Sequence, residues 1–312
     1  MKWVWFFSIY ILSVNVYTQS NRVVFWNVEN LFDTINDPNK NDDEFTSMGI
    51  RNWNSYRYKK KIHNLAQTIV GIGEWELPMI IGLCEVENRS VLYDLTHHEL
   101  LWKGNYQIVH YETADARGID PAIIYDPNRF KVFESGYIPL VYNGDSLRHI
   151  LWAKGVVCKG ETLIVYMNHW PSKYSGVIAT QPKRLLAAME LSKHIKFMLV
   201  ENPDIRILVG GDFNDEREEE SIKALERESG LICLIDENTS YTHKYREKWS
   251  LIDLVFGTKN LGRNIKARVF KSGNVLEKDE KNLGERPNRT YIGYSYHGGV
   301  SDHLPVYIDI CK

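Results

Sequence analysis

The sequence has few cysteines and prolines and no excess of charge of either sign. Its 312 residues include 4 Cys and 10 Pro, and 38 Lys and Arg nearly balance 40 Asp and Glu, for a net charge of −2. The cysteines are too far apart in sequence to form a metal knuckle or a redox pair. The balanced charge excludes a strong field that would attract nucleic acid from a distance. With 44% hydrophobic residues, the composition is that of a globular protein and excludes disordered and collagen-like chains.

Long apolar runs are also lacking after the first residues. Met1 and Lys2 precede the apolar run Trp3–Val16, which is short against the roughly 20 residues that span a bilayer. The pattern predicts a signal peptide over residues 1–18, although an uncleaved anchor is the alternative. We therefore expect an exported protein, periplasmic or extracellular, with no stable membrane insertion after cleavage. Export permits disulfides, and for Cys84, Cys158, Cys233 and Cys311 free thiols and disulfides are equally expected.

Short apolar runs predict eight strands, and several are too apolar for a sheet that faces water. The predicted strands are Val23–Glu29, Met79–Glu85, Ala122–Tyr125, Ile150–Val157, Thr162–His169, Ile205–Val209, Ile252–Phe256 and Leu304–Ile310. Apolar residues three and four apart predict amphipathic helices. These are Tyr56–Ile72 and Gln181–Val200, with shorter ones at Ser90–Leu101 and Glu216–Ser229. Helices at both ends of the chain and a strand-rich middle, roughly 105–170, predict an α/β fold with a mixed sheet.

Polar side chains occur in pairs where three of these apolar strands end. The pairs are Asn27 with Glu29, Glu85 with Glu87, and Asp212 with Asn214. Residues two apart in a strand lie on the same face, and ligand sites of open sheets collect beyond the carboxyl ends of strands. We therefore expect one acidic site. Crowded oxygen ligands call for a hard cation such as Mg²⁺, Mn²⁺ or Ca²⁺. Glu87 is expected at the rim of the site, not as a ligand.

Further strands bring histidine and a buried acid. Asp253 lies within the apolar run LIDLVF, where an unpaired carboxylate would be costly. The sequence Ser301-Asp302-His303 supplies an imidazole that could be its partner, and His169 ends another strand. The remaining candidates lie in the segment RGIDP: Arg117 for binding phosphate, with a surface ion pair as the alternative, and Asp120 for orienting His169.

Each motif alone is weak, but the set in this order resembles the endonuclease/exonuclease/phosphatase superfamily, the deoxyribonuclease-I-like metal-dependent phosphohydrolases. The resemblance extends from residue 23 to residue 310. It implies a four-layer sandwich, in which two mixed sheets pack face to face with helices outside, as one domain over residues 19–312. It also implies an exported, bacterial-type hydrolase of phosphate esters that depends on a divalent metal, expected to be Mg²⁺, with Mn²⁺ or Ca²⁺ as alternatives.

The resemblance also implies roles for single residues. Glu85 would bind the metal with help from Glu29 and Asp302, and Asn27 would orient the ligands or the phosphate. Asp212 would orient or deprotonate the attacking water, Asn214 would bind a phosphate oxygen, and His303, held by Asp253, would act on the phosphate or as an acid or base. His169 matches the strand-end histidine of the deoxyribonuclease-like and sphingomyelinase-like branches, whereas the apurinic-site branch has a tyrosine there.

Three function classes remain at this point. We expect a metal-dependent phosphodiesterase, an endonuclease that hydrolyses DNA or RNA, acting as a monomer with nucleic acid as substrate. The alternative is a phosphatase or phospholipase acting on inositol-phosphate or lipid headgroups with the same site. A catalytically silent binding module is least expected, because every motif position is filled.

Overall fold

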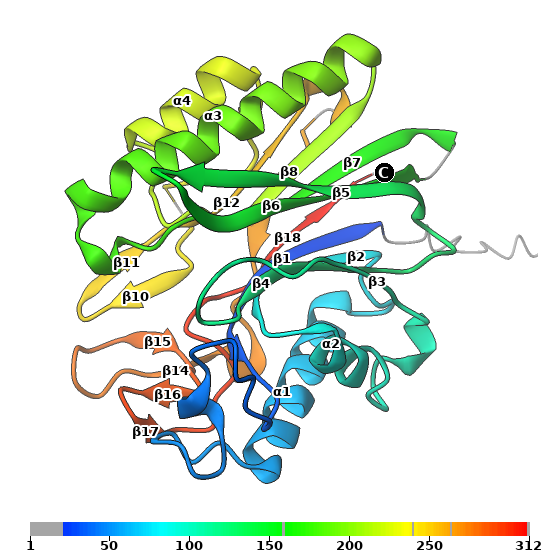
Figure 1. Cartoon of the computed structure of the whole chain (residues 1–312). Coiled ribbons are helices and arrows are strands. Elements are labelled where there is room, and N and C mark those ends of the chain that lie inside the picture. The colour runs from blue at the N-terminus through cyan, green and yellow to red at the C-terminus, as the bar shows by residue number, and fades with distance from the viewer. Residues whose placement is uncertain (1–20, 158–159, 239, 263, 311–312) are drawn as a thin grey trace, which may run out of the picture.

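The first strand, β1 (Arg22–Leu31), is buried on both faces. Its side chains alternate, so Val23 and Phe25 pack into one core cluster while Val24 and Trp26 pack into another. A strand with two buried faces must have packed layers on both sides. The computed structural model describes residues 21–157, 160–238, 240–262 and 264–310, and in it β1 lies between a second sheet and a layer of helices (Figure 1).

The strands form two mixed six-stranded sheets. The first has the order β13 (Arg268–Val269), β18 (Val306–Asp309), β1, β2 (Ile80–Val86), β4 (Asp120–Tyr125) and β3 (Gln107–His110). The second has the order β5 (Lys131–Tyr142), β6 (Asp145–Val156), β7 (Thr162–His169), β8 (Arg206–Asp212), β12 (Asp253–Gly257) and β9 (Ile232–Cys233). The pairs β1–β2 and β7–β8 are parallel and the other pairs are antiparallel, so both sheets are mixed.

Four helices cover the outer faces of the two sheets (Figure 1). Helices α1 (Ser55–Gly73) and α2 (Arg89–Thr96) lie on the first sheet, and α3 (Val177–Glu201) and α4 (Glu220–Ser229) lie on the second. Asn54 and Asn88 start α1 and α2 by accepting hydrogen bonds from the first free backbone N–H groups. The predicted four-layer sandwich is confirmed.

Three small hairpins extend beyond the sheets at the end where the active-site motifs lie (Figure 1). They are β10 (His243–Tyr245) with β11 (Lys248–Ser250), β14 (Leu276–Lys278) with β15 (Glu285–Pro287), and β16 (Tyr291–Ile292) with β17 (Ser295–Tyr296). Short 3₁₀ turns connect other elements: Asp43–Phe45, Trp102–Gly104, Lys173–Ser175, Lys259–Leu261 and Gly273–Val275. The polar segment 271–288 contains the β14–β15 hairpin.

Element boundaries differ from the sequence prediction in two instructive places. The predicted helix Ser90–Leu101 ends at Thr96 with His97 as its C-cap, and a separate 3₁₀ turn follows at Trp102–Gly104. The long strand β5 was missed, because as an edge strand it is largely exposed. Cys84 and Cys233 are free thiols, whereas Cys158, Cys311 and the predicted signal peptide lie outside the described residues. No helix of the described chain is long and apolar enough to cross a membrane.

Glycines let the two sheets approach closely beside the site. A Cβ on Gly82 of the first sheet would lie 2.5 Å from the Met167 sulfur, and one on Gly210 of the second sheet would lie 2.4 Å from the Phe25 ring. Each sheet therefore supplies a glycine that receives a large side chain from the other sheet. The close approach places the ends of β1 and β2 beside those of β7 and β8.

We expect Gly210→Ala to destabilise the protein, since the added methyl must displace the buried ring of Phe25. Overpacking of this kind costs about 1–3 kcal/mol. The matched control is Gly71→Ala in α1, where the nearest atom to an added Cβ lies 3.4 Å away and alanine is the better helix former by up to ~1 kcal/mol. Urea denaturation of both variants checks this. Equal midpoints for Gly210→Ala and the wild type would contradict the tight sheet contact.

Candidate active site

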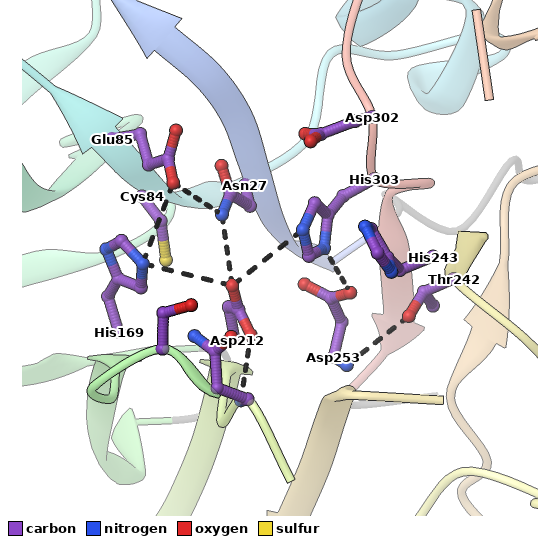
Figure 2. A network of polar contacts seen from close by, with 12 residues as sticks. Asn27, Cys84, Glu85, His169, Asp212, Thr242, His243, Asp253, Asp302 and His303 are labelled. Atoms are coloured by element: carbon purple, nitrogen blue, oxygen red, sulfur yellow. Dashed lines mark hydrogen bonds and ion pairs between the residues drawn. The ribbon is translucent and has the colours of Figure 1, made fainter. Parts of the chain in front are cut away.

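One amide group connects the two sheets at the predicted acidic site. The Asn27 Nδ2 at the end of β1 donates to Glu85 Oε1 of β2 at 3.3 Å and to Asp212 Oδ2 of β8 at 3.0 Å. Figure 2 shows these contacts at the centre of a wider polar network. Glu29, Asn30 and Glu85 have φ values of 52°, 54° and 62°, in the left-handed region. Such backbone strain is found mainly at functional sites.

His303 is held by a buried carboxylate, as predicted. Its Nδ1 lies 2.7 Å from Asp253 Oδ2, and its Nε2 lies 3.9 Å from Asp212 Oδ2. Asp253 is fixed in turn, because its backbone N–H donates to the Thr242 hydroxyl. Burial alone would lower the pKa of His303, but Asp253 and Asp212 overcome this effect and raise it well above the ordinary histidine value. His303 is therefore an imidazolium at neutral pH.

His169 lies near one of the same carboxylates, Asp212, but its pKa is shifted in the opposite direction. Its Nε2 lies 3.8 Å from Glu85 Oε1 and 3.9 Å from Asp212 Oδ2. Burial lowers its pKa well below the ordinary value, and the charges of Arg148 and Arg117 lower it further. The two imidazoles thus lie on either side of Asp212 (Figure 2), and their pKa values are shifted in opposite directions.

The prediction that Asp120 orients His169 is wrong, because Asp120 is bound to another histidine. Asp120 Oδ2 lies 3.0 Å from His110 Nε2, and Asp120 Oδ1 accepts from the Thr113 backbone. The Nδ1 of His169 has no hydrogen-bond partner in the described part of the chain. Strand pairing explains the error, because His110 of β3 lies beside Ala122 of β4 and competes for the carboxylate.

Asp212 and Asn214 form a tight turn at the end of β8. Asp212 Oδ1 accepts from the Asn214 N–H at 2.9 Å, and the Asn214 Nδ2 donates to the Trp170 carbonyl at 3.0 Å. Burial, with the nearby charge of Asp253, raises the pKa of Asp212 to about 7, despite the opposing charge of His303. A carboxylate that titrates near neutral pH can accept a proton from water and release it again.

The three predicted metal ligands are in different environments. Glu85 is at the centre of the site and accepts from Asn27 and from the Asn30 backbone. Glu29 instead accepts from the backbone N–H groups of Thr290 and Tyr291. In the structure Glu29 therefore holds this loop, and its role as a metal ligand stays a prediction. Burial raises its pKa to about 7.

Asp302 lies next to His303 but is bound by arginine. Its Oδ2 is 2.6 Å from the Arg289 Nη2. Burial would raise its pKa, but His303 and Arg289 lower it to about 2, so the carboxylate is ionised. The loop that carries Arg289 is also tied to the first sheet, because the buried Lys61 of α1 donates to the Thr290 hydroxyl and the Val300 carbonyl.

The donor set fits a hard divalent cation. Glu85, Asp302 and Asp212 each bring a carboxylate to this region, and Glu85 forms no ion pair with a lysine or arginine of the described residues. Oxygen ligands of this kind are those that Mg²⁺, Mn²⁺ and Ca²⁺ prefer. Another compact group, Asp212, Asp253 and His303, could also hold an ion, but His303 is already bound to Asp253.

Sequence reasoning missed three residues of the site. The His243 ring lies 4.8 Å from that of His303 (Figure 2), and burial lowers its pKa to about 4. Arg148 donates to the carbonyls of His169 and Trp170 and to Asp115, so it holds the end of β7. Arg289 holds Asp302. None of these lies in a distinctive motif, and only long-range packing brings them to the site. Arg117 is half-exposed and lies against Asp115 at the rim.

The family of the chain follows from its sequence. The family described as Endonuclease/Exonuclease/phosphatase matches residues 22–312. The chain belongs to this family. Its members are metal-dependent phosphoric ester hydrolases, and the chain is an enzyme of that class. No curated protein matches the sequence closely enough to count as a relative.

Solved structures with the family fold are similar over nearly the whole chain. The human nocturnin catalytic domain with bound sulfate is 17% identical with a TM-score of 0.60, covering 94% of each chain. A mannosyl-6-phosphatase of Bacteroides thetaiotaomicron is 18% identical with a TM-score of 0.62, covering 94% of this chain and all of its own (100%). Truncated Caenorhabditis elegans TDP2 is 15% identical with a TM-score of 0.58, covering 94% and 98%. At these identities the likeness shows the fold.

Asp253→Asn should destabilise this family member in a pH-dependent way. The raised pKa of His303 contributes stability that is complete below about pH 6.5 and is lost as the pH rises through the raised value. At pH 6, removing one partner of the buried pair should cost about 3–5 kcal/mol, and the cost should shrink at alkaline pH. Chemical denaturation across this range is the measurement.

The control for this prediction is Asp309→Asn. Asp309 pairs with Arg22 at the far end of β1, at 2.7 Å, and arginine does not titrate in this range. The stability that Asp309→Asn loses should therefore be the same at every pH in this range. If the stability lost in Asp253→Asn were also independent of pH, Asp253 would not be the group that keeps His303 protonated.

Proposed function

We propose that this chain is an exported phosphodiesterase, an endonuclease that hydrolyses DNA, and RNA as a second substrate, by in-line attack of water. The observation that carries the proposal is the pair of buried histidines, His169 and His303, that lie on either side of Asp212, with His169 also next to Glu85. A diester needs a base for the attacking water and a proton donor or cation for the oxygen that leaves. The site contains both, within contact of one another.

Each role follows from the protonation state of its residue. Asp212, with a pKa of about 7, accepts the proton of the attacking water. The imidazolium of His303 faces the phosphate and stabilises its growing charge, while Asp253 keeps the proton on the ring. The neutral His169 can donate a hydrogen bond to a phosphate oxygen through one ring nitrogen. Asn214 is held by Trp170 with its second amide hydrogen available to the substrate.

A divalent metal, which we propose to be Mg²⁺, would be held by Glu85 with Asn27 and Asp302. When bound, it supplies positive charge against the phosphate oxygens and lowers the pKa of water. Because Asp302 is paired with Arg289, the arginine can balance the charge of this carboxylate whether or not the metal is bound. Arg117, at the rim, would contact the phosphate backbone through its planar fork of donors.

The reaction is tested with supercoiled plasmid, RNA, sphingomyelin and inositol phosphates, each with Mg²⁺ and with EDTA. We expect plasmid nicking that EDTA abolishes and that falls by about 10²–10⁴-fold in His169→Ala and in Asp212→Ala. Arg227→Gln, on the exposed face of α4, is the matched control and should nick normally. If lipid or inositol phosphate is hydrolysed while the plasmid stays intact, the nuclease proposal is wrong and the phosphatase or phospholipase alternative takes its place. If no substrate is hydrolysed, a binding module is favoured.

We also propose that the protein acts after export, as a single domain of residues 19–312 and as a monomer. The apolar run Trp3–Val16 supports export. Expression of the full chain in a bacterial host should place the enzyme in the periplasm or medium, and N-terminal sequencing should find Gln19 first. A product that retains Met1 in the membrane fraction would contradict cleavage.

A further inference from the structure

The hairpins beside the active site enclose a small polar cavity. Its volume is about 80 Å³, and it is lined by Lys244, Arg246, Asp279, Asn282, Arg286, Pro287, Arg289, Ile292 and Asp302. At roughly 30 Å³ per water, this is room for about two or three waters, which is comparable with one phosphate group. The lining comes from all three hairpins and from the loop that precedes His303.

The cavity is continuous with the catalytic residues through Asp302. This carboxylate lines the cavity, and its oxygen lies within 4.8 Å of the ring nitrogens of His243 and His303. Figure 2 shows Asp302 on the side of His303 away from Asp253. A ligand in the cavity would therefore lie beside the group that is hydrolysed.

Positive charge exceeds negative charge on the cavity wall. Four cationic side chains line it against two carboxylates, Asp279 and Asp302. Two of the cations are fixed by other groups: Lys244 is buried and donates to Asp279 at 2.8 Å and to two backbone carbonyls, and Arg286 is bound to Glu277 at 2.7 Å. Arg289 is bound to Asp302. These three form a rigid wall.

Arg246 differs from the other three cations. Its guanidinium makes no ion pair or hydrogen bond with any described residue, and it lies 5.3 Å from the exposed ring of Tyr245. It is the first residue of the two-residue turn between β10 and β11 and has a φ of 56°. Glycine is favoured at such a position, because a side chain there strains the backbone. The fold thus retains an unpaired arginine where glycine would be more stable.

We propose that this cavity is an anion subsite that takes a second phosphate group of the substrate, next to the phosphate that is hydrolysed, with Arg246 as the residue that binds it. The proposal rests on the proposed function of a phosphoester hydrolase. The fork of N–H donors on arginine matches the oxygens of a phosphate, and Arg246 is the cation of this wall whose charge no described carboxylate balances. The second phosphate would come from the next nucleotide of a nucleic acid or from a sugar bisphosphate.

The test compares substrates with and without the additional phosphate. The nucleic-acid arm uses the dinucleotide TpT against pTpT and TpTp, and the sugar arm uses inositol 1-phosphate against inositol 1,4-bisphosphate. The readout is the ratio of kcat/KM between the members of each arm. In the wild type we expect at least one ratio to favour the additional phosphate by about 10-fold or more, as for a hydrogen bond to a charged group. The arm in which this occurs identifies the source.

Two substitutions at position 246 separate binding from folding. Arg246→Gly should reduce the ratio to near one while keeping or raising the melting temperature, since it relieves the strained turn. Arg246→Lys should keep part of the preference, because it keeps the charge without the fork. Arg227→Gln is the control and should keep the whole ratio. A ratio that Arg246→Gly leaves unchanged, or wild-type ratios near one in both arms, would overturn the proposal.

Direct binding distinguishes a failed subsite from a failed function. Calorimetry with deoxythymidine 3′,5′-bisphosphate and with deoxythymidine 5′-monophosphate measures the affinity without requiring turnover. Tighter binding of the bisphosphate that is lost in Arg246→Gly would uphold the subsite even if no diester were hydrolysed. Hydrolysis of diesters by a protein that binds both nucleotides equally would leave the proposed function standing and reject the subsite.

Discussion

The active site depends on one buried contact between the two sheets, the amide of Asn27 with Glu85 and Asp212. Two carboxylates from opposite sheets would repel one another, and a shared donor lowers that repulsion while fixing their separation. The contact forms only because the sheets approach closely at this end, where Gly82 and Gly210 leave space for Met167 and Phe25. The geometry of the site therefore depends on the packing of the two sheets.

Around this contact, the environment sets a different protonation state for each group. His169 and His303 are both buried beside Asp212, yet one is neutral and the other is cationic at neutral pH. The difference arises from their partners, since His303 is bound to Asp253 whereas His169 has Arg148 and Arg117 nearby. Separating the titration of like groups in this way assigns acid and base roles within a single site. Behind them, the buried Lys61 and Glu29 hold the loop that carries Arg289.

Much of this site could be predicted from short motifs, because its main residues terminate apolar strands. Glu85, Asp212 and His169 follow buried runs, and the carboxyl ends of such strands meet in space. The pair of Asp253 with His303 could also be predicted, because a buried carboxylate needs a donor. What could not be predicted are the partners that come from elsewhere in the chain. Asp120 is bound by His110 of the neighbouring strand, and Glu29 accepts hydrogen bonds from a loop that is distant in sequence.

The sequence by itself determined the main buried strands, the amphipathic helices, the family and the candidate residues of the site, because these depend on local periodicity and on motifs a few residues long. Only the tertiary structure decided which ionisable side chains lie in contact with one another. His243, Arg148 and Arg289 lie in a hairpin, a strand and a loop outside the motifs, and their contacts join residues that are far apart in the sequence. The energy of a buried charge depends on everything around it, and that surrounding exists only once the two sheets are packed.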